Sequence, residues 1–213
     1  MLHDHRGLAV STDSSAALEH FETALAQFHA YRGDPIATLD QALAADESFV
    51  LAHLAKAFMA ATAGEGRVVP LARSAVARAE ELSGQANARE RALLVAARQL
   101  VDGKWHDACR SFDAVLREWP RDALVVQTAH LMDFYRGDAL NLRNRVSRVL
   151  PSWSASLPGY SYLLGMHAFG LEEIGACGRA QAVGRRALEI EPRNSAAIHA
   201  VAHALASAGD PLA

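Results

Sequence analysis

His199 and His203, near the C-terminus, are the residues in this sequence best suited to chemistry. They lie four residues apart in an alanine-rich stretch that favours a helix, so both imidazole rings are expected on one helix face. Two neutral imidazoles at this spacing can bind zinc if a third ligand is present, and an imidazole oriented by a carboxylate can act as a general base. The pair can equally fill the end of a groove without doing chemistry.

A carboxylate for these histidines could come from Glu172 or Glu173, in the preceding predicted helix pair. This gives one hypothesis, a hydrolase-like or metal-dependent enzyme that uses His199 and His203 with one of these glutamates. No phosphate-binding glycine loop, Gly-x-Ser-x-Gly turn or His-Glu-x-x-His motif occurs in the sequence. The main hypothesis is therefore noncatalytic recognition with no cofactor and no metal, and His199 and His203 are the candidate ligands if a metal binds.

Glycines recur along the chain at a nearly regular interval and indicate where helices end. The intervals between them are 31, 39, 34, 38 and 34 residues, and the glycines are Gly33, Gly64, Gly103, Gly137, Gly175 and Gly209. Each follows an amphipathic segment long enough for about four helical turns, and the alternating pattern of β-strands is almost absent. The sequence predicts an all-α chain in which each glycine ends a helix.

A helix, a glycine and a second helix within about 34 residues is the arrangement of tetratricopeptide repeats, which stack into a right-handed α-solenoid. We predict one such domain over residues 1–213, with about five and a half repeats and an incomplete sixth repeat at 194–213. Asp122, Asp138 and Asn194 are predicted to cap helix N-termini. Because the last helix has no successor to cover it, a homo-oligomer through this helix is also possible.

In tetratricopeptide arrays the first helix of each pair lines a concave groove, and its positions can be counted back from each glycine. The predicted groove residues are Leu54, Phe58, Leu93, Gln127, Leu131, Phe134, Tyr162, Phe169, Glu172, His199 and His203. Such an apolar, partly aromatic surface suits a protein, a peptide or a small apolar ligand. His53, His130 and His167 fall off these positions and are predicted to pack in the core against backbone partners. His3 and His5 are predicted to lie in a frayed terminal segment.

Composition excludes several function classes. The chain has 21 lysines and arginines against 24 acidic residues, so it has no strong basic field for nucleic acid or an anionic membrane. It contains no secretory signal pattern and no apolar run long enough to cross a bilayer, which predicts a cytoplasmic protein. Its two cysteines, Cys109 and Cys177, lack a metal or redox spacing and are expected to be free thiols.

Three segments resemble the tetratricopeptide repeat protein 38 family. They are residues 11–35, which end in Gly-Asp-Pro, residues 159–173, which end in Phe-Gly-Leu-Glu-Glu, and the His-x-Val-Ala-His motif at 199–203. The resemblance covers essentially the whole chain and implies a helical repeat fold. Members of that family are longer, so the resemblance implies an N-terminal portion of a larger architecture.

Overall fold

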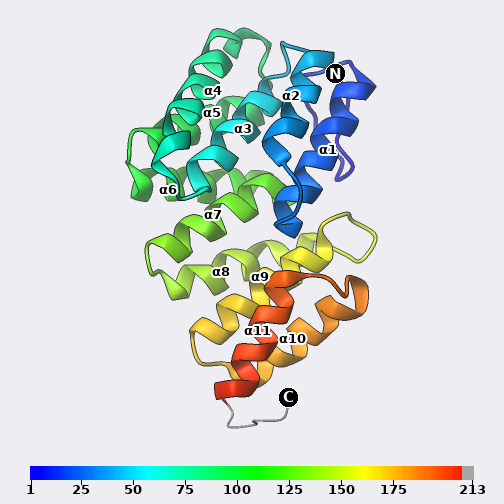
Figure 1. Ribbon diagram of the computed structural model, residues 1–213, viewed down its shortest axis with the longest axis vertical. Coiled ribbons are helices and arrows are strands. Elements are labelled where there is room, and N and C mark those ends of the chain that lie inside the picture. The colour runs from blue at the N-terminus through cyan, green and yellow to red at the C-terminus, as the bar shows by residue number, and fades with distance from the viewer. Residues whose placement is uncertain (208–213) are drawn as a thin grey trace. The chain divides into compact units, whose positions relative to one another are not determined.

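Eleven α-helices joined by short turns make up most of the computed structural model, which describes residues 1–207 (Figure 1). The α-helices are α1 (Ser15–Ala30), α2 (Pro35–Ala45), α3 (Val50–Thr62), α4 (Val69–Glu81), α5 (Ala88–Val101), α6 (Trp105–Glu118), α7 (Ala123–Tyr135), α8 (Ala139–Val149), α9 (Tyr160–Glu173), α10 (Cys177–Ile190) and α11 (Ser195–Ser207). Three short 3-10 segments lie at Gly66–Val68, Ser83–Gln85 and Leu150–Ser152. Residues 1–207 contain no β-strand, so the all-α prediction is confirmed.

The turns between helices follow the predicted glycines, with one exception. Gly103, Gly137 and Gly175 have left-handed φ values of 75°, 66° and 76°, and in each case the next residue donates a backbone hydrogen bond five residues back. At the end of α1 the same bond runs from Arg32 to Gln27, but the left-handed residue is Tyr31, with φ 52°. Tyr31, not Gly33, therefore ends the first helix. The sixth predicted marker, Gly209, lies outside the described residues.

Side-chain caps begin four of the helices, and three of these caps, Asp122, Asp138 and Asn194, were predicted. Asp34 and Asp138 accept hydrogen bonds from backbone N–H groups at the starts of α2 and α8. Asp122 accepts from the Val125 N–H at 3.0 Å, and Asn194 accepts from the Ala197 N–H at 3.1 Å. These side chains satisfy amides that have no partner within the helix, which confirms Asp122, Asp138 and Asn194 as caps.

The chain divides into two compact units. Unit 1 comprises Met1–Phe28 and Arg32–Thr128, and unit 2 comprises His29–Tyr31 and the residues from Ala129 onward. In unit 1, aromatic contacts join neighbouring helices: Phe58 of α3 meets Phe112 of α6 edge-on at 5.5 Å between ring centroids. The prediction of a single domain over residues 1–213 stays a prediction, because two compact units can belong to one repeat array or to two domains.

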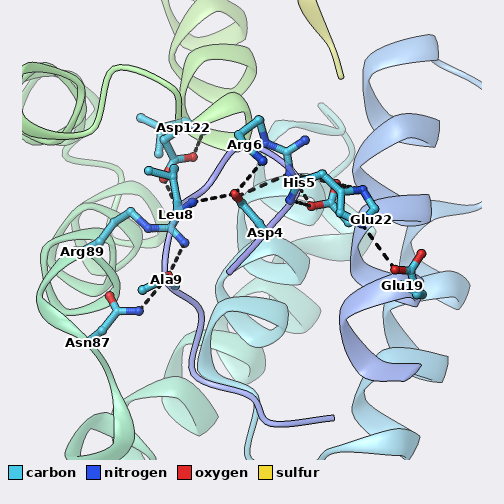
Figure 2. Close-up of polar contacts among 11 residues, drawn as sticks. Asp4, His5, Arg6, Leu8, Ala9, Glu19, Glu22, Asn87, Arg89 and Asp122 are labelled. Atoms are coloured by element: carbon cyan, nitrogen blue, oxygen red, sulfur yellow. Dashed lines mark hydrogen bonds and ion pairs between the residues drawn. The ribbon is translucent and has the colours of Figure 1, made fainter. Parts of the chain in front are cut away.

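The N-terminal segment before α1 is fixed in place, so the prediction of a frayed terminus is wrong. We call residues 2–12 the N-terminal strap (Figure 2). Arg6 of the strap is 4% exposed and donates from one guanidinium nitrogen to both carboxylate oxygens of Glu22 in α1, at 2.6 and 2.8 Å. Asp4, whose pKa is raised by burial, accepts backbone hydrogen bonds from Arg6 and Leu8. Buried charges of this kind are stable only when they are paired.

The other side of the strap is bound to the start of α5. Arg89 donates to the Ala9 carbonyl at 2.9 Å and to the Asp122 carboxylate at 2.6 Å, as Figure 2 shows. Glu90 accepts from the Ser11 N–H at 2.9 Å while it also closes the capping box of α5. The strap therefore joins helices that are far apart in the sequence of unit 1.

Unit 2 packs its helices closely because glycines stand where a Cβ atom would collide. A Cβ on Gly170 of α9 would lie 2.6 Å from the Arg143 nitrogen and from the Leu142 carbonyl carbon in α8. A Cβ on Gly184 of α10 would lie 2.5 Å from a methyl group of Val201 in α11. Small buried residues complete these contacts, including Ala187 and Ala197. Among residues 1–207, no helix is long and apolar enough to cross a membrane.

Candidate ligand pocket

A pocket of about 340 Å³ opens in unit 2, and we call it the aromatic pocket. Its lining comes from the end of α1, from α7 and α9, and from the first turns of α11. The lining residues are Tyr31, His130, Leu131, Phe134, Met166, Phe169, Ser195, Ala196 and His199. Four of them, Leu131, Phe134, Phe169 and His199, were predicted groove residues. These described lining residues include no Asp, Glu, Lys or Arg, so the pocket suits an uncharged ligand.

Phe169 is the centre of the aromatic cluster in this pocket. Its ring contacts Phe134 at 5.8 Å, His130 at 5.8 Å and His199 at 5.6 Å between centroids, with interplanar angles of 55° to 69°. Tilted and edge-to-face arrangements at these distances are favourable for aromatic pairs. Phe134 nevertheless remains 49% exposed, so much of its surface is open to a ligand.

Tyr31 lines the pocket from a left-handed backbone conformation. A non-glycine residue held there costs roughly 1–3 kcal/mol, which glycine avoids at equivalent helix ends. Its residue surface is 55% exposed, so core packing does not account for the side chain at this position. The sequence did not identify Tyr31 because Gly33, two residues later, is the residue type expected at the end of a helix.

His130 was predicted to be a packing histidine with a backbone partner, and it has one. Its ring interacts with the backbone of Leu142, while Nδ1 has no hydrogen-bond partner among the described residues. The prediction that it lies away from the ligand surface is wrong, because its ring lines the aromatic pocket. Burial lowers the pKa of His130 to about 3, with a smaller contribution from the Arg145 charge, so the imidazole is neutral at physiological pH.

Acid should therefore weaken the fold through His130. The unfolded side chain binds a proton below about pH 6.5, whereas the folded one stays neutral until about pH 3. Its contribution to stability is complete above pH 6.5 and is lost as the pH falls through this window, by up to about 1.4 kcal/mol per pH unit. Urea unfolding between pH 7 and pH 4.5 should show a shallower decline for His130→Gln than for the wild type. His203→Gln, at a side chain 55% exposed, is the control; equal slopes for His130→Gln and wild type would contradict the assignment.

The histidine pair lies at the edge of the aromatic pocket. The rings of His199 and His203 are 4.1 Å apart between centroids, and His203 Nδ1 is 3.8 Å from Glu172 Oε1. That separation is within ion-pair range but too long for a hydrogen bond. Glu172 Oε2 is buried and has no hydrogen-bond partner among the described residues, while Glu173 is exposed. Glu172, not Glu173, is therefore the glutamate near the histidines.

These residues do not assemble a metal site. Within the described part of the chain, no group of three or more histidine, cysteine, aspartate or glutamate side chains has a geometry that could hold a metal ion. Zinc sites in proteins need at least three protein ligands, so His199 and His203 fall short unless another ligand is added.

The remaining predicted groove residues lie elsewhere. Leu54, Phe58 and Leu93 of unit 1 are 0% exposed and Gln127 is 1% exposed, so no ligand can reach them in this structure and they do not line a groove. Helix packing on both sides of α3 and α5 buries the face that the repeat pattern placed on the surface. Tyr162 stacks on His29 at 5.6 Å between centroids and is not part of the aromatic pocket.

The pocket contains residues that the repeat pattern did not select. Met166 and Ser195 line it together with Tyr31 and His130. Counting back from a glycine marks one face of one helix in each pair, whereas this pocket also uses a helix end and the first turn of another helix. No local pattern in the sequence identifies Tyr31, because its exposure and its left-handed backbone are visible only in the structure.

Comparison with known protein families finds none that matches this chain. No solved structure matches it either.

Proposed function

We propose that this protein is a noncatalytic recognition module and that the aromatic pocket of unit 2 binds an apolar ligand, either a small molecule or an apolar side chain of a peptide. The observation that carries the proposal is the lining itself: aromatic and aliphatic side chains surround about 340 Å³, with no charged carboxylate, ammonium or guanidinium group among them. Ligand pockets in proteins typically have a volume of roughly 300–1,000 Å³ and a predominantly apolar lining.

The proposal also covers the fold and family of the protein that contains this pocket. The repeated helix, left-handed turn and second helix support a tetratricopeptide-like α-solenoid and the resemblance to the tetratricopeptide repeat protein 38 family. A cytoplasmic location and association of two copies through α11 belong to the same proposal. Ile198 of α11 is 49% exposed, which supports the idea of an apolar contact there.

Two adjacent aromatic residues offer a matched test of the pocket. Phe134 lines it and is 49% exposed, whereas Tyr135 is 43% exposed and is not among its lining residues. The probe is 6-propionyl-2-(dimethylamino)naphthalene, an uncharged dye whose emission shifts on transfer to an apolar site. We expect saturable binding to the wild type, about tenfold weaker binding to Phe134→Ala and unchanged binding to Tyr135→Ala. If all three proteins bind the dye equally, or if the wild type does not bind it, the proposal is wrong.

A hydrolase-like activity is the second candidate, and the approach of Glu172 to His203, 3.8 Å between Oε1 and Nδ1, beside His199 is the observation that favours it. An imidazole near a carboxylate at the edge of an apolar pocket can remove a proton from water during ester hydrolysis. The test is the release of 2-naphthol from 2-naphthyl acetate. Turnover above the buffer rate that disappears in both His199→Ala and His203→Ala would replace the noncatalytic proposal.

A further inference from the structure

Tyr31 occupies a position that favours glycine. Four helix ends in the described residues share a hydrogen bond from one residue to the carbonyl five positions back, and three of them have glycine at the left-handed position. The fourth has Tyr31, which is more than half exposed and lines the aromatic pocket. Strained backbone conformations at exposed residues concentrate where a side chain contacts a ligand.

Volume limits the size of the ligand. An apolar cavity of about 150 Å³ accommodates benzene. The aromatic pocket is a little more than twice that size, at about 340 Å³, which leaves room for two fused rings that carry a small substituent. A single ring would leave much of the pocket in contact with water.

The lining also limits the chemistry of the ligand. Phe169 presents tilted and edge-to-face contacts to three neighbouring rings, and Phe134 and Tyr31 add exposed ring surface on the same pocket. Aromatic rings gain more from such surroundings than saturated rings of the same volume, because their faces and edges carry opposite partial charges. With no charged carboxylate, ammonium or guanidinium group in the lining, a charged ligand would lose its hydration without gaining an ion pair.

We infer that the pocket takes an uncharged, planar aromatic molecule of two fused rings and that Tyr31 is a specificity-determining residue whose ring contacts this molecule. The inference rests on the proposed function and goes further, since it names the ligand class and the residue that selects it. Tyr31, in its left-handed conformation, lines the aromatic pocket with its side chain. A glycine at this position has no side chain and would leave that part of the pocket wall open.

Competition between two alcohols with the same fused-ring carbon skeleton, one aromatic and planar and the other saturated, tests the ligand class. The naphthalene dye is displaced from the wild type with 2-naphthol and, separately, with decahydro-2-naphthol, which has the same hydroxyl group and saturated rings. We expect 2-naphthol to compete about tenfold better. If both alcohols compete equally, the pocket is apolar without being selective for aromatic rings, and the inference fails although the proposed function stands. If neither alcohol competes and the dye does not bind, the proposed function fails as well.

Variants of Tyr31 test its role through two measurements, the melting temperature and the affinity for 2-naphthol. Tyr31→Gly is expected to raise the first and lower the second. Tyr31→Gly should raise the melting temperature by about 2–4 °C, because glycine accepts the left-handed conformation, and should weaken 2-naphthol binding about fivefold. Tyr31→Ala should weaken binding equally without the gain in melting temperature, and Tyr31→Phe should bind within about twofold of the wild type. Wild-type affinity in Tyr31→Gly, or a fall in its melting temperature, would overturn the role assigned to Tyr31.

Discussion

Replacing Gly170 with alanine is expected to destabilise unit 2 more than the same substitution at Gly165, Gly178 or Gly184, the other glycines within α9 and α10. The new Cβ would meet backbone atoms of Leu142 and Arg143 in α8 at 2.6 Å, and backbone cannot rotate away as a side-chain end can. α8 and α9 would have to separate, at a cost of about 3 kcal/mol or more. Each kcal/mol lowers the melting temperature by about 2–8 °C, depending on whether the whole chain or one unit unfolds cooperatively.

Gly178→Ala is the matched control for Gly170→Ala. Gly178 lies in α10, also within unit 2, but a Cβ there would meet nothing within 4 Å. The same substitution should leave stability unchanged or raise it by about 0.5–1 kcal/mol, because alanine is the better helix former. Thermal unfolding followed by circular dichroism measures both variants. Similar melting temperatures for the two would show that α8 and α9 do not approach as closely as described.

The second large effect is expected at the buried ion pair of Asp133 and Arg145. Arg145 is 1% exposed and binds both carboxylate oxygens of Asp133, with Nε and Nη2 at 2.8 and 3.0 Å. Burial raises the pKa of Asp133, so the carboxylate depends on the guanidinium for its charged state. Asp133→Leu leaves Arg145 buried without its carboxylate, and we expect a loss of about 3–5 kcal/mol in the free energy of unfolding.

Two comparisons isolate the charge effect. Asp133→Leu combined with Arg145→Met removes both charges and should recover most of the loss, because apolar side chains can replace a buried pair at little cost. Glu189→Gln breaks an exposed pair with Arg186, whose side chains are 63% and 61% exposed, and should cost less than about 0.5 kcal/mol. Urea unfolding measures all of these proteins. A double variant as unstable as the single one would assign the loss to packing instead of to the removal of the Asp133 carboxylate from Arg145.

Helix positions could be predicted from this sequence because local signals agree with one another. Gly103, Gly137 and Gly175 end helices through their left-handed backbone, and Asp138 and Asn194 begin helices through side-chain capping. These signals depend on a few neighbouring residues, which a sequence displays directly. The ordered conformation of the N-terminal strap could not be predicted because its partners in α5 are about 80 positions away in the sequence. No local sequence pattern indicates such distant contacts.

The candidate site was predicted only in part for a similar physical reason. Phe134, Phe169 and His199 lie on helix faces that repeat spacing identifies, and all three line the aromatic pocket. The same spacing selected Leu54 and Phe58, whose helix α3 is covered by neighbouring helices. Spacing identifies which residues share a face, whereas the packing of other helices decides whether that face is open to a ligand.

The N-terminal strap also constrains the order in which unit 1 can mature on the ribosome. Ala9 and Ser11 of the strap bind Arg89 and Glu90, which lie 80 and 79 positions later in the sequence. At roughly 5–20 residues per second, these partners are made about 4–16 s after the strap. Throughout that interval Ala9 and Ser11 lack these partners, so the strap cannot complete its contacts until α5 has emerged. The strap is thus synthesised well before the α5 residues that complete its contacts.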